Sequence, residues 1–319
     1  MKIALLGTGF GQAHAAVYAG RDDVDEVVVF GRTPQKLASI GEQFGFATTT
    51  DLDTLLADAS VDLVDICLPT GLHAEVAIRA MQAGRDVLIE LPLADTLADA
   101  HRIVATQQDT GRRAFVDMFS RFSPADQHLR QAVADQRHGP LQVLEIETRT
   151  ALLWEGYDLG LSTLSMDMMH ADFDLVTALL GRPDTMHVVG TEALAGRGSA
   201  ATVTLGYPHA IAHCTGSALM PQPYGVRGGW RATFTDAVLE YAMRAGYTGQ
   251  GPSSLTECTA EGERPIDLPT TSPYAAMIDH VLACLAGRAD NLIEPDSALA
   301  ALELTLDIQD RLTQMGFPS

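Results

Sequence analysis

The sequence predicts an α/β domain with a doubly wound parallel sheet, followed by an α+β domain with an open, mostly antiparallel sheet. Two observations predict this order. Up to about residue 120, short β-branched runs alternate with amphipathic runs of helix length, whereas beyond Pro124 extended runs follow one another. The length, 319 residues, is about twice that of a typical domain. We therefore expect one domain over residues 1–122 and a second over residues 123–319, with the last helix, 296–315, able to pack back on the first.

The elements of the first domain follow from its alternating runs. The expected strands are 2–7, 26–31, 61–69, 86–92 and 112–119, and the expected helices are a helix through 14–20, then 33–44, 73–84 and 97–111. Strand runs such as VVVF and VLIEL have no polar alternation, which is expected when helices cover both faces of a sheet.

The second domain is expected to begin with a helix over 125–139. The expected strands are 141–152, 185–194, 199–208, 210–220 and 230–243, with a long helix over 164–180 and two closing helices over 274–287 and 296–312. The exposed face of this open sheet, carrying Val203, Leu205, Ile211 and Trp230, would be a large apolar patch on a monomer. We therefore expect a homodimer or homotetramer formed through that face.

Composition excludes several classes of partner and site. Apolar residues make up 46% and charged residues 19%, as in compact globular proteins. The 41 acidic and 21 basic side chains give a net charge of −20 without a basic block, so nucleic acid and anionic membrane are poor partners. The four cysteines are scattered without zinc-ligand spacing, and no apolar run is long enough for a membrane span or a signal peptide. We expect a cytoplasmic protein.

A glycine-rich turn lies directly between the first strand and the first helix. Its residues are Gly7, Thr8, Gly9, Phe10, Gly11 and Gln12. Glycines in this place permit a tight turn and let backbone N–H groups and the helix N-terminus approach a pyrophosphate. Gln12 stands where the third glycine of GxGxxG would fall, beside Gly11. The motif predicts a dinucleotide-binding Rossmann domain; the alternative is a turn that only connects strand and helix.

The residues after the second strand indicate which dinucleotide is bound. An NAD-selective site would carry an acidic residue there, but the sequence has Arg32, Thr33 and, one turn later, Lys36. A guanidinium, a hydroxyl and an ammonium are suited to holding a 2′-phosphate, so NADP is preferred and NAD remains possible. The alternative is a solvated Arg/Lys pair on an exposed loop.

Four motifs in order give the chain a family likeness. The glycine turn, the run Leu68–Glu75 (LPTGLHAE), the run Asp86–Ala94 (DVLIELPLA) and the run Arg121–Pro124 (RFSP) together resemble the Gfo/Idh/MocA oxidoreductase family, which also places an open antiparallel sheet behind a Rossmann domain. The resemblance implies that the cofactor is bordered by Leu68, Pro69, Thr70, His73 and Glu90. His73 has a second interpretation, as a helix N-terminal residue hydrogen-bonded to the backbone.

The sequence departs from the family pattern in two places. The family's Glu-Lys-Pro, whose lysine helps to polarise the substrate oxygen, is replaced by Glu90-Leu91-Pro92. When the aspartates of the second family motif are matched to Asp167 and Asp174, the general-base histidine falls on Ala171, with His170 one residue earlier.

Helix geometry supplies substitute catalytic candidates. Asp167, His170 and Asp174 fall at i, i+3 and i+7, on one helix face, with Asp172 pointing away. His170 would carry the proton, and one of the two aspartates would fix its tautomer. A packing histidine is the main alternative, and a metal site is not expected because no further histidine converges on the cluster.

The substrate candidates are Arg121, Trp154 and Tyr157. Arg121 would hold a polar or anionic group, or else pair with a carboxylate, and the two aromatic residues lie in a loop that borders the substrate in the family.

Taken together, the motifs predict an NADP-preferring oxidoreductase that transfers a hydride to or from a small polar molecule: a sugar, cyclitol, hydroxy acid or cyclic hemiacetal or aldehyde. The stretch Glu90–Asp95 resembles the carboxy-hydroxymuconate-semialdehyde dehydrogenase group of the family, whose cyclic hemiacetal oxidises to a lactone. The alternative is a non-catalytic cofactor-binding regulator or scaffold of the same fold. Redox-assisted glycoside cleavage on the same cofactor also stays open.

Overall fold

The computed structural model describes residues 1–151, 159–193, 198–245 and 251–315. The chain forms two compact units. Unit 1 comprises Met1–Phe122 and Pro273–Leu299, and unit 2 comprises Ser123–Ser272 and Ala300–Ser319. The segment Pro273–Leu299, which we expected in the second domain, thus belongs to unit 1. In the described part of the chain, no helix has the length and apolarity to cross a membrane.

The described residues of unit 1 form a parallel sheet with the strand order β3-β2-β1-β4-β5-β6. Its strands are β1 (Lys2–Leu6), β2 (Glu26–Phe30), β3 (Ala47–Thr49), β4 (Leu63–Ile66), β5 (Asp86–Ile89) and β6 (Ala114–Val116). The helices of the unit are α1 (Gly11–Tyr18), α2 (Pro34–Phe44), α3 (Leu52–Ala57), α4 (His73–Gln82), α5 (Leu97–Thr110) and α9 (Pro273–Leu285). β4, β5 and β6 are buried along their whole length, as expected for strands that helices cover on both faces. The predicted doubly wound sheet is confirmed.

The described residues of unit 2 form a larger sheet with the order β14-β13-β12-β11-β7-β10-β9-β8. Its strands are β7 (Leu141–Ala151), β8 (Thr185–Glu192), β9 (Ser199–Gly206), β10 (Ile211–Met220), β11 (Val226–Phe234), β12 (Ala237–Ala245), β13 (Ser253–Thr259) and β14 (Gly262–Ile266). All neighbouring pairs are antiparallel except β7 and β10, which are parallel. The predicted open, mostly antiparallel sheet is confirmed.

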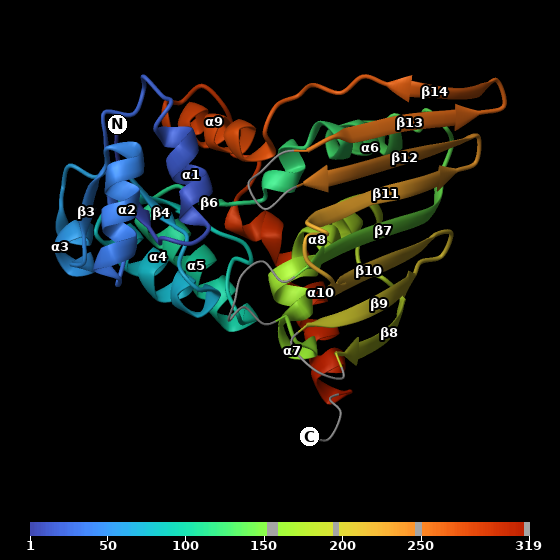
Figure 1. The fold of residues 1–319 in the computed structure, drawn as a ribbon, viewed down its shortest axis with the longest axis horizontal. Helices are drawn as coiled ribbons and strands as arrows, with labels where there is room; N and C mark the ends of the chain where they lie inside the picture. Colours follow the sequence, from blue (N-terminus) through green and yellow to red (C-terminus); the bar gives the residue numbers. More distant parts are fainter. Residues whose placement is uncertain (152–158, 194–197, 246–250, 316–319) are drawn as a thin grey trace. The chain divides into compact units, whose positions relative to one another are not determined.

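Helices cover one face of this sheet and complete its core. They are α6 (Pro124–Ala134), α7 (Leu161–Leu164), α8 (His170–Leu180) and α10 (Pro295–Gln314), and Figure 1 shows α7, α8 and α10 along one face. Phe173 of α8 and Ile308 of α10 share a fully buried core with Leu144 of β7 and Val203 of β9. Each apolar side chain buried there removes nonpolar surface from water and stabilises the fold by about 1.5–3 kcal/mol.

Two expected elements were wrong in detail. The run 230–243, predicted as one strand, belongs to two strands, β11 and β12, which reverse direction at Thr235 and Asp236. This turn contains no glycine or proline, and Asp236 is a turn-favouring residue without a second one beside it, so the local signal was weak. The expected helix 164–180 is interrupted by a π-helical turn over Ser165–Met169. A π-turn adds a residue to the helical repeat, so the spacing calculated for a regular α-helix no longer holds across it.

The exposed face of the unit 2 sheet is polar. Val203 and Leu205 are fully buried and Trp230 is 5% exposed, because their side chains point to the covered face; Ile211, at 40%, is exposed. Arg231 lies on the open face and forms ion pairs with Glu145 and Glu240. The large apolar patch expected on this face was therefore wrong, and the homo-oligomer expected from it stays a prediction without that support.

Candidate functional site

The glycine turn of unit 1 has the geometry of a phosphate-binding turn. Gly7 has φ +129°, and a Cβ at this position would lie 2.2 Å from the backbone oxygen of Cys67. Gly11 is the first residue of α1, so the N-terminus of the helix lies at this turn, although the N–H groups of Gln12 and Ala13 already donate to the backbone oxygens of Gly9 and Phe10. The Gln12 side chain donates a hydrogen bond to the backbone oxygen of Thr8 at 3.0 Å. Gln12, in place of a third glycine, thus closes the turn with its own side chain.

The basic residues after β2 are placed as the sequence predicted. Arg32, Thr33 and Lys36 are all exposed, and Thr33 precedes α2 without capping it through its side chain. Within the described ranges, Arg32 and Lys36 have no hydrogen bond or ion pair. The neighbouring Gly31 packs closely on this turn, since a Cβ there would lie 2.7 Å from the Thr8 methyl group. The two cationic side chains are therefore available to a ligand that the glycine turn holds.

Both ring nitrogens of His73 contact backbone oxygens of the chain itself. His73 is 1% exposed, its Nε2 lies 2.7 Å from the backbone oxygen of Leu68, and its Nδ1 lies 3.0 Å from that of Pro92. Burial lowers the pKa of His73, against the opposite effect of the two carbonyl oxygens. The ring therefore joins the loop after β4 to the loop that carries Glu90, which matches its second interpretation, as a backbone-bonded residue at a helix start. The neighbouring Pro69 is exposed, and Leu68 and Thr70 are half-buried.

Sequence reasoning missed a buried charged cluster beneath this edge of the parallel sheet. His14, on α1, donates from Nδ1 to Oδ2 of Asp65 at 2.8 Å and from Nε2 to Oδ2 of Asp117 at 2.9 Å. The Tyr18 hydroxyl also donates to Oδ2 of Asp65, at 2.7 Å. His14 and both aspartates have no exposed side-chain surface. Although burial opposes the charged form, Asp65 and Asp117 raise the pKa of His14 well above its usual value, so the ring is an imidazolium.

Glu90 adds a third carboxyl group to this cluster. It directly follows β5, is partly exposed, and accepts a hydrogen bond from the Leu91 N–H at 2.7 Å. A ring nitrogen of His14, a carboxyl oxygen of Glu90 and a carboxyl oxygen of Asp117 all lie within 4.8 Å of one another. Burial and the nearby Asp117 carboxylate raise the pKa of Glu90 to about 8. Burial also raises the pKa of Asp117, despite its hydrogen bond from His14.

The same atoms could serve as metal ligands, as could those of His14, Asp65 and Cys67. Both ring nitrogens of His14, however, already lie at hydrogen-bond distance from carboxylate oxygens, and a metal-bound imidazole nitrogen carries no proton. The geometry therefore favours a proton-bearing cluster over a metal centre. The missed signal in the sequence was the presence of Asp65 and Asp117 inside apolar strand runs, where a buried carboxylate requires a partner.

The predicted catalytic residues of unit 2 do not share one face. His170 is 1% exposed, and its Nδ1 lies 2.8 Å from the Thr305 hydroxyl, which itself donates to the backbone oxygen of Ala301. Thr305 therefore accepts the Nδ1 proton, so a hydroxyl holds the ring where an aspartate was expected. Asp174 is buried beside Arg130 at 3.3 Å, whereas Asp167 is exposed. The π-turn over Ser165–Met169 explains the error, because Asp167 lies within it, whereas His170 and Asp174 follow it in the regular helix α8.

Asp172, which was expected to point away, is half-buried and lies 3.3 Å from the Thr148 hydroxyl on β7. Burial raises its pKa to about 7.

Arg121 binds the chain's own residues. Its guanidinium donates to the backbone oxygen of Leu292 at 3.1 Å and to the hydroxyl and backbone oxygen of Ser297 at 2.8 and 2.9 Å. These contacts join the turn after β6 to Leu292 and to the first turn of α10. The substrate-holding role expected for Arg121 stays a prediction, which these contacts do not support. Trp154 and Tyr157 lie outside the described residues.

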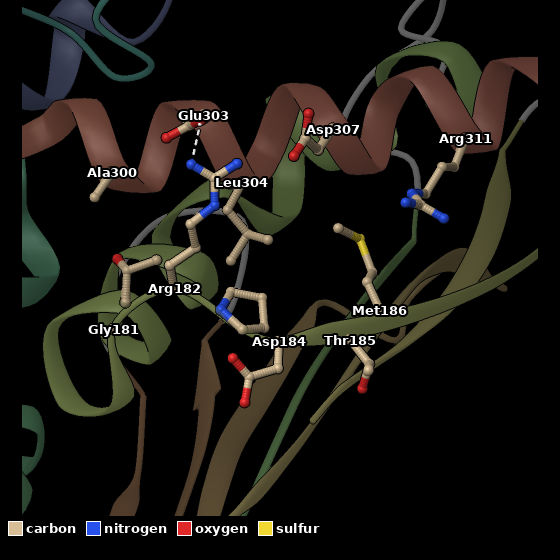
Figure 2. A pocket seen from close by; sticks show the side chains of 12 residues that line it. Gly181, Arg182, Asp184, Thr185, Met186, Ala300, Glu303, Leu304, Asp307 and Arg311 are labelled. Atoms are coloured by element: carbon tan, nitrogen blue, oxygen red, sulfur yellow. Dashed lines mark hydrogen bonds and ion pairs between the residues drawn. The ribbon is translucent and has the colours of Figure 1, made fainter. Parts of the chain in front are cut away.

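Unit 2 also contains a pocket of about 340 Å³ between the residues after α8 and the surface of α10 (Figure 2). Arg182 and Glu303 form an ion pair of 2.7 Å at one end, and Arg311 lies at the other. Asp167, His170 and Asp174 do not line this pocket. The pocket therefore does not support the prediction that these three residues are catalytic.

Comparison with known proteins agrees with the Rossmann geometry. Residues 1–118 match the Gfo/Idh/MocA model, which describes an oxidoreductase family with an NAD-binding Rossmann fold. The chain is 36% identical over 152 residues to 4-carboxy-2-hydroxymuconate-6-semialdehyde dehydrogenase of Sphingobium sp., covering 47% of each chain. It is 30% identical over 199 residues to inositol 2-dehydrogenase of Rhizobium meliloti, covering 61% of this chain and 59% of the relative. The matches thus span about half to three fifths of these relatives.

Solved structures match over nearly the whole chain. UDP-N-acetylglucosamine 3-dehydrogenase from Acidithiobacillus ferrooxidans superposes with a TM-score of 0.81 at 25% identity, covering 97% of both chains. Aldose-aldose oxidoreductase from Caulobacter crescentus superposes with a TM-score of 0.80 at 20% identity, covering 99% of this chain and 98% of the other. The second likeness shows the fold alone.

Proposed function

Because the chain belongs to the Gfo/Idh/MocA oxidoreductase family, we propose that it is an NADP-preferring oxidoreductase acting on a CH–OH or carbonyl group of a small polar substrate. The observation that carries this proposal is the glycine turn at the N-terminus of α1, followed after β2 by two cations, Arg32 and Lys36, that have no partner among the residues the structure describes. Gly7 and Gly11 let the backbone approach a pyrophosphate, and Arg32 and Lys36 supply positive charge for a 2′-phosphate. When bound, the nicotinamide supplies or accepts the hydride.

The cofactor preference has a direct test. Arg32→Ala should weaken NADPH binding by about tenfold or more, the worth of one charge-assisted hydrogen bond, and leave NADH binding nearly unchanged. Arg102→Ala is the matched control, because Arg102 is an exposed arginine of α5 that pairs locally with Asp99. Fluorescence titration of both reduced cofactors measures the two affinities. An unchanged ratio of NADPH to NADH affinity in Arg32→Ala would show that the 2′-phosphate assignment is wrong.

The proposed substrate classes are sugars, cyclitols, hydroxy acids and cyclic hemiacetals or aldehydes. Support comes from relatives whose names specify a semialdehyde, inositol and a nucleotide sugar, all with a carbinol or carbonyl carbon that can exchange a hydride. The measurement is absorbance at the reduced-nicotinamide band against a panel of these compounds. We keep His170 as a candidate proton carrier. Since Thr305 engages its Nδ1, a transferred proton would move at Nε2.

A second candidate function is a cofactor-binding regulator without turnover. It is favoured by Leu91 and Ala171, which stand where the family pattern that the sequence resembles has a lysine and a histidine. Tight binding of NADPH with no turnover of any compound in the panel would support this alternative.

A further inference from the structure

Glu90 is packed against titratable groups from four parts of unit 1. They are His14 on α1, Asp65 and Cys67 at the end of β4, Asp117 after β6, and Tyr274 on α9. Tyr18 of α1 joins the cluster through its hydrogen bond to Asp65. The Tyr274 ring stacks on Phe119 at 4.3 Å and lies 6.1 Å from the His14 ring, which closes the cluster on that side. The only cation in this set is the His14 imidazolium. Whether Glu90 is ionised therefore depends on how much of the positive charge of His14 is already balanced by the other carboxyl groups.

The two N–H groups of His14 are already used. They donate hydrogen bonds to Asp65 and Asp117, so two carboxylates share one positive charge. The cluster therefore has a net negative charge even before Glu90 is counted. In addition, within the described residues the Oδ1 of Asp117 has no hydrogen-bond partner. Ionising Glu90 would add a third carboxylate a few ångströms away with little water to screen it. Glu90 therefore holds its proton at neutral pH.

The position of Glu90 allows this proton to be exchanged. Glu90 follows the carboxyl end of β5, the edge at which parallel sheets of this kind bind their ligands, and its side chain is partly exposed. The next residue is Leu91, also partly exposed, which brings no charge to the site. A lysine in its place would put an ammonium next to the carboxyl group and favour the ionised form.

We propose that Glu90 is the acid–base residue of this enzyme, exchanging one proton with the substrate oxygen, and that Leu91 keeps Glu90 protonated. In the reducing direction the Glu90 carboxyl O–H bond breaks and its proton goes to the carbonyl oxygen. The C=O π bond would open as its carbon receives the hydride that a bound nicotinamide supplies, leaving an alcohol, an oxidised nicotinamide and a Glu90 carboxylate. In the oxidising direction the carboxylate takes the hydroxyl proton and the same bonds change in reverse. This inference rests on the proposed function, in which the cofactor provides the hydride.

The first test measures the proton without any substrate. In protein labelled with ¹³C at the glutamate carboxyl groups, one resonance should titrate near pH 8 and be absent in Glu90→Gln. Leu91→Lys should lower this titration by at least about one pH unit, because a neighbouring cation favours the carboxylate. Leu91→Met, a neutral side chain of similar volume, should leave it in place. A Glu90 resonance that titrates below about pH 6 in the native protein overturns the proposal.

The second test concerns the reaction. For carbonyl reduction, kcat/KM of the native enzyme should fall as pH rises through about 8, since only protonated Glu90 can donate. In Glu90→Gln, kcat/KM should drop by about a hundredfold or more and lose this inflection. Loss of the inflection in His170→Asn, with Glu90→Gln unaffected, would assign the proton to His170 instead.

The tests separate failure of this inference from failure of the proposed function. If no compound turns over, the carboxyl titration still decides whether Glu90 holds a proton, and NADPH titration decides whether the cofactor binds. One equivalent of a divalent metal retained after dialysis, and lost in Glu90→Gln, would overturn the proposal in favour of a metal centre.

Discussion

The protonated Glu90 should be visible in the stability of the protein. Its pKa is about 8 in the folded protein, against an ordinary value of 4.5, so between these pH values the folded protein retains a proton that the unfolded chain releases. A carboxyl group with a raised pKa therefore stabilises the fold less as pH rises above 4.5, until the loss is complete above pH 8. Each pH unit within this window corresponds to about 1.4 kcal/mol.

Glu90→Gln removes this titration while keeping an oxygen that can accept from the Leu91 N–H. As pH rises from about 6 to about 8, the free energy of unfolding of the native protein should fall by roughly 2–3 kcal/mol relative to that of the variant. The comparison cancels other titrating groups, such as His14, which both proteins share. Glu75→Gln is the matched control, because Glu75 is an exposed glutamate on α4 and its replacement should show no such trend.

The assay is urea unfolding followed by circular dichroism at several pH values. Because the chain has two compact units, hydrogen-exchange protection of the β4 amides (Leu63–Ile66) should be measured beside it as a reporter of unit 1. Parallel stability curves for the native protein and Glu90→Gln across this range would refute the reasoning, because they would mean that Glu90 is ionised in the folded protein.

Three further substitutions test other parts of the structure. Gly7→Ala should abolish NADPH binding in a fluorescence titration, because its Cβ would lie 2.2 Å from the Cys67 oxygen at φ +129°. His14→Phe should lower the free energy of unfolding by about 3–5 kcal/mol in urea titrations at pH 7, since it leaves two buried carboxylates without their cation. Trp230→Phe should cost about 1–3 kcal/mol in the same assay, because Asp126 loses its 2.8 Å hydrogen bond; no change would contradict that pairing.

Most of the parallel sheet could be predicted from sequence, because five of the six strands that the described residues form in it lie in short, mainly apolar runs. The strand β3 (Ala47–Thr49), which is short, polar and largely exposed, was missed. The second sheet could be predicted only in part, since its pairing depends on contacts distant in sequence. The parallel pairing of β7 with β10 joins strands more than 60 residues apart, and no local pattern distinguishes it from an antiparallel pair. The turn at Thr235 and Asp236 lacks glycine and proline, so two strands were predicted as one.

The site shows the same division between local and distant information. The glycine turn is encoded within six residues, so its geometry could be predicted. The hydrogen bonds of His14 connect it to Asp65 and Asp117, which lie 51 and 103 residues away, so only the fold brings them together. A regular helix was assumed through His170, and a single π-turn was enough to change which of its neighbours share a face.

The buried cluster of His14, Asp65 and Asp117 gives a different explanation for Leu91, which stands in place of the family's lysine. In sequence terms, replacement of a lysine by leucine removes a proton donor and suggests loss of chemistry. In the structure, the adjacent Glu90 lies beside a cluster that already has more carboxylates than cations, and a neutral residue at 91 preserves the protonated form. A lysine would supply its own proton but would ionise Glu90, so the two arrangements exclude each other. Leu91 is therefore best explained as part of a different acid–base arrangement, which Leu91→Lys would dismantle even though it restores the family motif.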